Sequence, residues 1–170
     1  MPRRRLFPSV TPAQVRAVVG PGERVLAWTM DATGRPVAAS TAALYLPAVD
    51  DLGGGHERLA YETVAAATWD EPTLEIVTVG PSRRRFSLTL DEPGLLPQTV
   101  RDRVTASIVV SEHVPLIGSA GARITARRPL VGPGEVSWNV VFDQGLDPGD
   151  PQLREAADAA IAYLQAATGL

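Results

Sequence analysis

Short clusters of glycine and proline divide this sequence more sharply than any other feature. The chain of 170 residues holds 15 glycines and 15 prolines, and many of them gather at expected turns. Such residues interrupt helices and strands, so each piece between two clusters must form its own short element. Up to residue 93 the pieces alternate apolar and polar residues, which predicts a meander of antiparallel strands. The clusters lie at residues 20–22, 53–55, 80–81, 93–94, 132–134 and 147–149.

The strands can be placed by this alternation. In the first of them Leu26, Trp28 and Met30 are spaced two apart and are expected to share one face. A short helix over residues 12–19 precedes it, with Thr11 as its capping residue. We expect strands at residues 24–30, 36–41, 43–46, 58–69, 74–79, 84–90, 123–128 and 136–142.

Two longer helices follow from a change of period. Leu96, Val100 and Val104 fall at helical spacing, which predicts a helix over residues 97–109. The second helix, over residues 151–167, begins after the capping residue Asp150. Its alanine-rich apolar stripe favours packing on the chain's own sheet, with a subunit contact as the alternative. The fold class expected is α+β, an antiparallel β-sandwich or bent sheet with capping helices.

Three segments and one tryptophan resemble bacterial pleckstrin-homology-like domains. A Gly-Glu strand opening lies at 22–27, a Thr-x-x-Leu-Tyr strand at 41–45, and a Tyr-Glu-x-Val entry at 61–64, followed by Trp69. The resemblance covers about residues 20–110 and implies a pleckstrin-homology-like topology that serves mostly as a binding platform. Residues 111–170 are expected to add a strand-strand-helix extension within a single domain over 1–170.

The resemblance does not carry over an inositol phosphate site. Eukaryotic relatives of the fold often bind such ligands through basic residues in and beside the first strand turn. Here residues 31–35 form that turn, and they contain only Arg35 together with the acidic Asp31. We therefore do not expect this turn to bind a phosphate.

Composition excludes several kinds of chemistry. The chain has no cysteine, and all 16 basic residues are arginine. Thiolate nucleophiles, cysteine-held metals and lysine Schiff bases are therefore impossible. His56 and His113 are the only histidines. His56 follows Asp50 and Asp51, which could offer oxygen ligands to a metal, but such a cluster is more often a solvated loop. We expect no metal, no cofactor and no catalytic residue.

Arginine clusters are the only candidates for a binding site. The candidates are Arg83, Arg84, Arg85, Arg127 and Arg128. They could contact phosphates if the fold brought them together, although charged residues also protect exposed strand edges and simply remain solvated. The net charge of −3 disfavours a general attraction to nucleic acid. The tryptophans at 28, 69 and 138 are expected in the sheet core rather than as stacking platforms.

These observations favour a cytoplasmic binding or scaffolding module without catalytic activity, with a protein as partner. No apolar run reaches the length of a membrane-spanning helix, and Pro8 interrupts any signal-like segment after the basic amino end. Two alternatives stay open: an enzyme whose site is assembled only in space, and an arginine-dependent nucleic-acid-binding protein. The sequence leaves the oligomeric state open.

Overall fold

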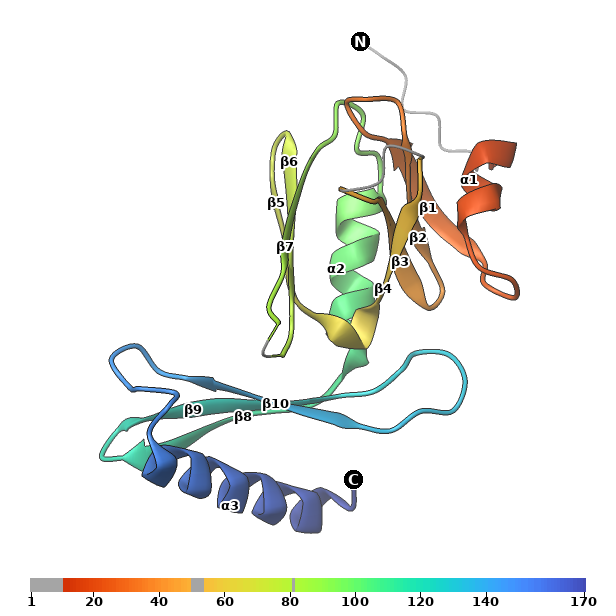
Figure 1. The fold of residues 1–170 in the computed structure, drawn as a ribbon. Helices are drawn as coiled ribbons and strands as arrows, with labels where there is room; N and C mark the ends of the chain where they lie inside the picture. Colours follow the sequence, from red (N-terminus) through yellow and green to blue (C-terminus); the bar gives the residue numbers. More distant parts are fainter. Residues whose placement is uncertain (1–10, 50–53, 81) are drawn as a thin grey trace.

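The computed structural model describes residues 11–49, 54–80 and 82–170. These residues form a mixed α+β fold of three antiparallel sheets and a C-terminal helix (Figure 1). The expected α+β class and antiparallel pairing are confirmed. The elements are α1 Ala13–Val18, β1 Val25–Met30, β2 Pro36–Ser40, β3 Ala43–Pro47, β4 His56–Ala60, a 3-10 turn Tyr61–Thr63, β5 Val64–Asp70, β6 Thr73–Thr78, β7 Arg85–Thr89, α2 Leu96–Ser107, β8 Ile108–Ile117, β9 Ala120–Arg127, β10 Ser137–Phe142 and α3 Pro151–Thr168.

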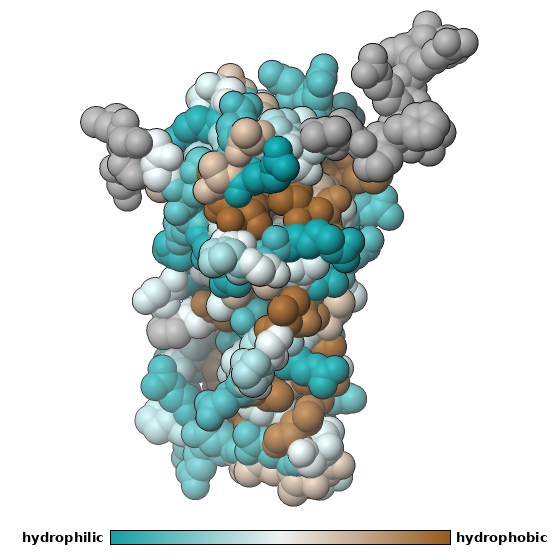
Figure 2. Space-filling view, turned by 90° about the vertical axis from the view of Figure 1, so that its right-hand side faces the viewer, coloured by the Kyte–Doolittle hydropathy of each residue, from teal (hydrophilic) through white to brown (hydrophobic). Residues whose placement is uncertain are grey.

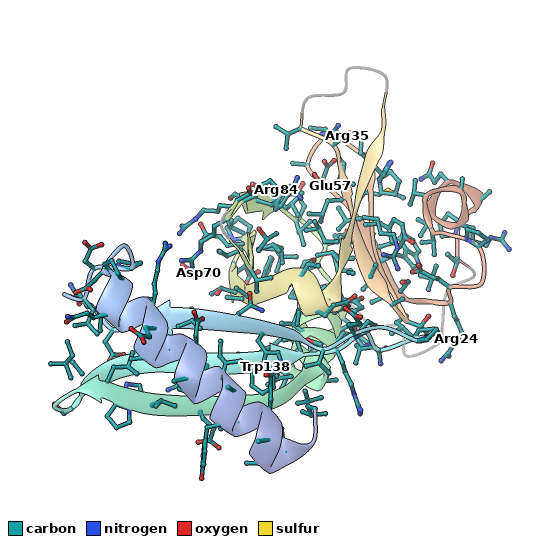
Figure 3. The ribbon with its side chains drawn as sticks, turned by 60° about the horizontal axis from the view of Figure 1, so that its bottom comes forward. Arg24, Arg35, Glu57, Asp70, Arg84 and Trp138 are labelled. Carbon is teal, nitrogen blue, oxygen red and sulfur yellow. The ribbon has the colours of Figure 1, made fainter. Side chains whose placement is uncertain are left out.

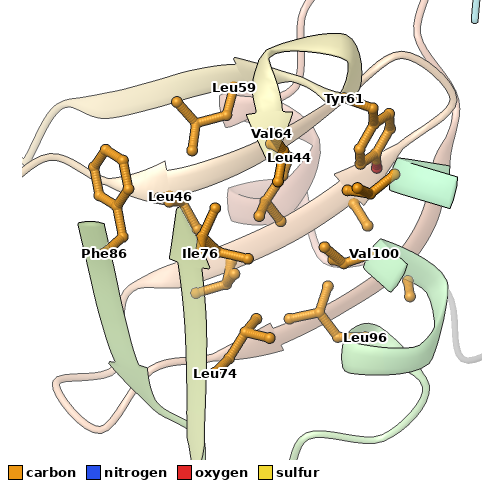
Figure 4. Close-up of a cluster of buried hydrophobic side chains, with 14 of the residues drawn as sticks. Leu44, Leu46, Leu59, Tyr61, Val64, Leu74, Ile76, Phe86, Leu96 and Val100 are labelled. Carbon is orange, nitrogen blue, oxygen red and sulfur yellow. The ribbon is translucent and has the colours of Figure 1, made fainter. Parts of the chain in front are cut away.

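The first two sheets and α2 enclose the main core. One sheet has the order β1-β2-β3-β4 and the other β5-β6-β7, and α2 lies beside both (Figure 1). Apolar side chains from both sheets and the helix meet between them (Figure 4). Burying such side chains supplies most of the stabilisation of a fold of this size. Those that are fully buried include Leu44, Leu46, Tyr61, Val64, Leu74, Ile76, Leu96 and Val100.

Two strand predictions need correction. The expected strand over 58–69 is broken into β4 and β5 by the 3-10 turn, which lets the chain pass from one sheet to the other. Leu26 does not share a face with Trp28 and Met30 as expected, because it is the extra residue of a bulge between Val25 and Ala27. Ala27 faces the main core, while Trp28 and Met30 pack against a smaller cluster beside α1.

The C-terminal part forms a third sheet of order β10-β9-β8, on which α3 lies (Figure 1). It holds three strands, not the two expected. The expected helix over 97–109 ends at Ser107, and Ile108 begins the ten-residue strand β8. A Cβ added to Gly121 would lie 1.9 Å from the Val114 oxygen of β8, so only glycine permits this close approach.

The last helix agrees with its prediction in position. The Asp150 carboxylate accepts a hydrogen bond from the Gln152 backbone N–H at 2.8 Å, and Gly169 ends the helix with a left-handed φ of 70°. Leu153 and Ala157 are buried, and α3 lies against the sheet of its own chain. Within this chain the helix thus contacts its own sheet through these two residues, and the choice between this packing and a subunit contact stays a prediction.

No helix among the described residues is both long and apolar enough to cross a membrane. The face that carries α1 shows apolar side chains in separate patches divided by polar ones (Figure 2). On this face the described residues form no continuous apolar surface.

Candidate functional site

The candidate site is a cleft between the β5-β6-β7 sheet and the C-terminal part of the chain. It has a volume of about 600 Å³ and follows strand β10, from which Figure 3 labels Trp138. Its walls come from β5, the β6–β7 connection, β10 and the start of α3. The described lining residues are Ala65, Thr78, Val79, Gly80, Arg83, Trp138, Asn139, Val140, Val141, Phe142, Pro148 and Arg154.

Both charged residues of the described lining are arginines. Arg83 follows the β6–β7 turn, is exposed, and forms no ion pair or hydrogen bond with its side chain to any described residue. Arg154 lies in the first turn of α3, where its Nε donates to the Pro148 carbonyl at 2.7 Å. Neither guanidinium forms an ion pair with a described carboxylate, so both are able to pair with an anionic ligand.

The remaining lining gives the cleft a mixed character. Trp138 is half-buried rather than inserted in the sheet core as expected, so part of its ring is open to a ligand. Asn139 adds a side-chain amide, which can donate and accept hydrogen bonds. A few polar groups placed among apolar ones are the usual make-up of a binding cleft.

The first arginine cluster is divided by the structure. Arg84 forms an ion pair with Glu57 at 2.5 Å (Figure 3) and lies over the Phe86 ring, while Arg85 is 3.6 Å from Glu75. Arg83 alone of the three lines the cleft. The acidic partners of Arg84 and Arg85 separate these side chains from Arg83, so the three arginines do not form one free basic patch.

The second cluster is divided as well. Arg128 is exposed, whereas Arg127 is only 5% exposed. The Arg127 guanidinium donates to the carbonyls of Val104 and Ala65 and to the Ser107 hydroxyl, and burial lowers its pKa. A cation at the end of α2 faces the negative end of the helix dipole. Arg127 therefore joins the third sheet to the first body, which is formed by the first two sheets and α2, and is not among the described lining residues of the cleft.

Arg154 is the site residue that the sequence analysis missed. The sequence does contain a signal for this residue. Arg154 stands in the fourth position after the capping residue Asp150, where the helix dipole disfavours a positive charge. An arginine placed against the dipole suggests a task other than helix stability.

A partly buried polar cluster was the strongest alternative site. The Glu23 carboxylate accepts hydrogen bonds from Arg58 at 2.8 and 3.0 Å and from the Ser40 hydroxyl, and Arg58 also contacts Tyr45. Ser40 is completely buried and cannot meet a substrate. The cluster ties the entry of β1 to β2, β3 and β4, which is a structural role.

This cluster predicts a pH dependence of stability. Burial raises the pKa of Glu23, but hydrogen bonds from Ser40, Arg58 and Tyr45 outweigh it and hold the pKa below its usual value of 4.5. A carboxyl whose pKa is lowered by folding stabilises the fold above its unfolded pKa and loses that contribution as the pH falls through the folded pKa. We expect Glu23→Gln to cost about 1–2 kcal/mol at pH 7, and the cost to shrink below pH 4.5.

Urea unfolding of both proteins between pH 3 and 7, in roughly half-unit steps, measures this difference. Glu75, which is half exposed and pairs only loosely with Arg85, supplies the matched control Glu75→Gln. A cost for Glu23→Gln that stays constant across the pH range contradicts the prediction.

The histidines lie apart. His113 Nε2 is 2.9 Å from the Asp143 carboxylate, and hydrogen bonds from His113 and the Gly121 N–H lower the pKa of Asp143. His56 Nε2 contacts the Pro36 carbonyl, while Asp50 and Asp51 lie outside the described residues. In the part of the chain that the structure describes, no three potential metal ligands gather.

A second cavity, of about 650 Å³, lies beside Trp69 and the start of α2. Arg101 and Asp102 both line it, so its charges offset each other. It lacks the one-sided charge of the cleft along β10.

Comparison with protein-family models, curated proteins and solved structures gave no match. The site is therefore argued from its own geometry.

Proposed function

We propose that this chain is a cytoplasmic binding module without catalytic activity, which recognises an anionic group of a protein partner in the cleft along β10. One observation carries the proposal: Arg83 and Arg154, far apart in sequence, line the same cleft with no acidic residue among its described lining. Charge-assisted hydrogen bonds from guanidinium groups to carboxylates or phosphates are among the stronger polar contacts in proteins.

The architecture of the first body supports the binding-platform class. Two small antiparallel sheets followed by α2 favour the pleckstrin-homology-like topology, because a sandwich closed by a helix is what the resemblance implies. The anion site proposed here lies outside that body's first strand turn. In this turn Asp31 accepts hydrogen bonds from Thr33 and from the Arg35 backbone, so the turn is held together internally.

The two other function classes receive less support. A nucleic-acid interface needs several free cations on one surface, whereas Arg84 and Arg85 face acids and Arg127 is buried. For an enzyme, the cleft lacks an acid or base among its described lining residues, and neither histidine lines it.

The proposal is tested by titrating citrate and inorganic phosphate into isotope-labelled protein and following the arginine Nε–H and backbone signals. We expect Arg83→Gln and Arg154→Gln each to weaken binding by about tenfold, because each removes one charge-assisted contact. Arg128→Gln is the matched control, since Arg128 is exposed and outside the cleft lining. Equal affinity in all four proteins, or no binding of either anion, contradicts the proposal.

A further inference from the structure

The open edge of β10 carries this inference, which rests on the proposed function. The third sheet has the order β10-β9-β8, so β10 pairs with β9 on one side only. Its residues 138–142 all line the cleft. An edge strand presents a row of N–H and C=O groups that can pair with another strand.

The register identifies the outward backbone groups. The Asp143 N–H donates to the Gly121 carbonyl at 2.9 Å, so Asp143 directs its backbone groups toward β9. The pairing continues without a register shift through Val141↔Arg123 and Asn139↔Thr125. Backbone direction alternates along an antiparallel strand, so the odd-numbered residues of β10 bond to β9.

The even-numbered residues face the other way. Trp138, Val140 and Phe142 turn their N–H and C=O groups away from β9. Within the described residues none of these groups has a backbone or side-chain partner. Three consecutive outward positions offer the hydrogen-bonding pattern that a short extended peptide requires.

The arginines select the charge of that peptide. Arg83 belongs to the body above the third sheet, and Arg154 belongs to α3 below it (Figure 1). Neighbouring side chains of a strand point to opposite faces of a sheet. A strand added to β10 therefore places two adjacent acidic side chains toward the two arginines.

We propose that the cleft takes an extended acidic peptide segment of a protein partner, which adds to the outer edge of β10 as a fourth strand of the sheet. A second copy of this chain fits less well. Pairing β10 with β10 would bring two Arg83 and two Arg154 side chains to one edge, where like charges repel. A nucleic acid would meet the arginines but leave the strand's alternating donors and acceptors unmatched.

The test uses a nine-residue probe of alternating valine and threonine with two adjacent glutamates at its centre. We expect bound peptide to slow amide hydrogen exchange at Trp138, Val140 and Phe142 by at least about tenfold, because these N–H groups gain acceptors. Exchange at Asn139 and Val141 should change little, since both already bond to β9. A probe with glutamine in place of glutamate should bind about a hundredfold more weakly, because it loses both arginine contacts.

Two further comparisons separate strand addition from simple charge attraction. The Val140→Pro variant removes an outward N–H without removing a bond to β9, and proline is tolerated at such edge positions. Val140→Thr keeps that N–H and is the matched control. A probe with N-methylated backbone at alternate positions should lose binding to the unchanged chain, while citrate, which needs no strand pairing, should still bind that chain.

The outcomes are distinguishable. If citrate binds through Arg83 and Arg154 while the probe protects none of the three amides, strand addition is wrong and the anion site stands. The same conclusion follows if the N-methylated probe binds the unchanged chain as tightly as the unmodified acidic probe does. It also follows if the acidic probe binds Val140→Pro as tightly as it binds the unchanged chain. If neither citrate nor the probe binds, both proposals fail. Concentration-dependent protection without peptide would make a second copy the occupant and overturn the acidic-peptide proposal.

Discussion

Replacing Arg127 by alanine is expected to lower the free energy of unfolding by about 2–4 kcal/mol. The guanidinium lies 3.3 Å from the Val104 carbonyl, 3.1 Å from the Ser107 hydroxyl and 3.2 Å from the Ala65 carbonyl. Ala65 is the extra residue in the bulge of β5, where the ladder with β6 shifts. Alanine at position 127 would remove the guanidinium donor from these three groups and open a cavity between the third sheet and the first two sheets.

Urea unfolding followed by circular dichroism measures this effect. Arg128→Ala, one position along, should change the free energy of unfolding by less than about 0.5 kcal/mol because that side chain is exposed. Arg127→Met should cost less than Arg127→Ala, since methionine fills much of the volume and avoids the burial of a charge without a carboxylate partner. An unchanged unfolding midpoint for Arg127→Ala would show that the side chain does not hold the two parts together.

The contrast between Arg83 and Arg127 marks the limit of sequence reasoning for the site. Both stand in short arginine clusters, and nothing in their immediate neighbours separates a free cation from a buried one. The difference arises from contacts between residues far apart in the sequence. Arg127 donates hydrogen bonds to the end of α2 and to the β5 bulge, whereas the exposed Arg83 lines the cleft. The sequence sets Arg154 apart only by its place against the helix dipole, and its position in the cleft follows from where α3 lies.

The fold was more accessible, because its strands and helices follow local patterns. Turn residues separate most strands, and the capping residue Asp150 marks the start of α3. Strand β8 escaped prediction because no glycine or proline separates it from α2, and Ile108 continues the helical spacing of Val100 and Val104. The helix ends there because residues from 108 on gain a ladder with β9, a contact that local periodicity does not report.

The packing of α3 leads to the second large effect, which concerns Leu153. This side chain is 4% exposed and, with Ala157, forms the buried contact of α3 with its sheet. We expect Leu153→Ala to lower the free energy of unfolding by about 2–4 kcal/mol, from lost apolar burial and the cavity left behind. Tyr163→Ala is the control, because Tyr163 is 73% exposed on the same helix and its loss should cost less than about 0.5 kcal/mol.

Thermal melting measures the stability of each variant, and light scattering measures its mass. A helix that packs on its own chain predicts a lower melting temperature for Leu153→Ala with an unchanged mass, whereas a subunit contact predicts a lower mass. Leu153→Ala should also weaken citrate binding, since Arg154 follows Leu153 in the first turn of α3 and a loosened helix no longer holds its guanidinium beside β10. Tight citrate binding by a variant whose third sheet and α3 have melted would separate Arg154 from the site.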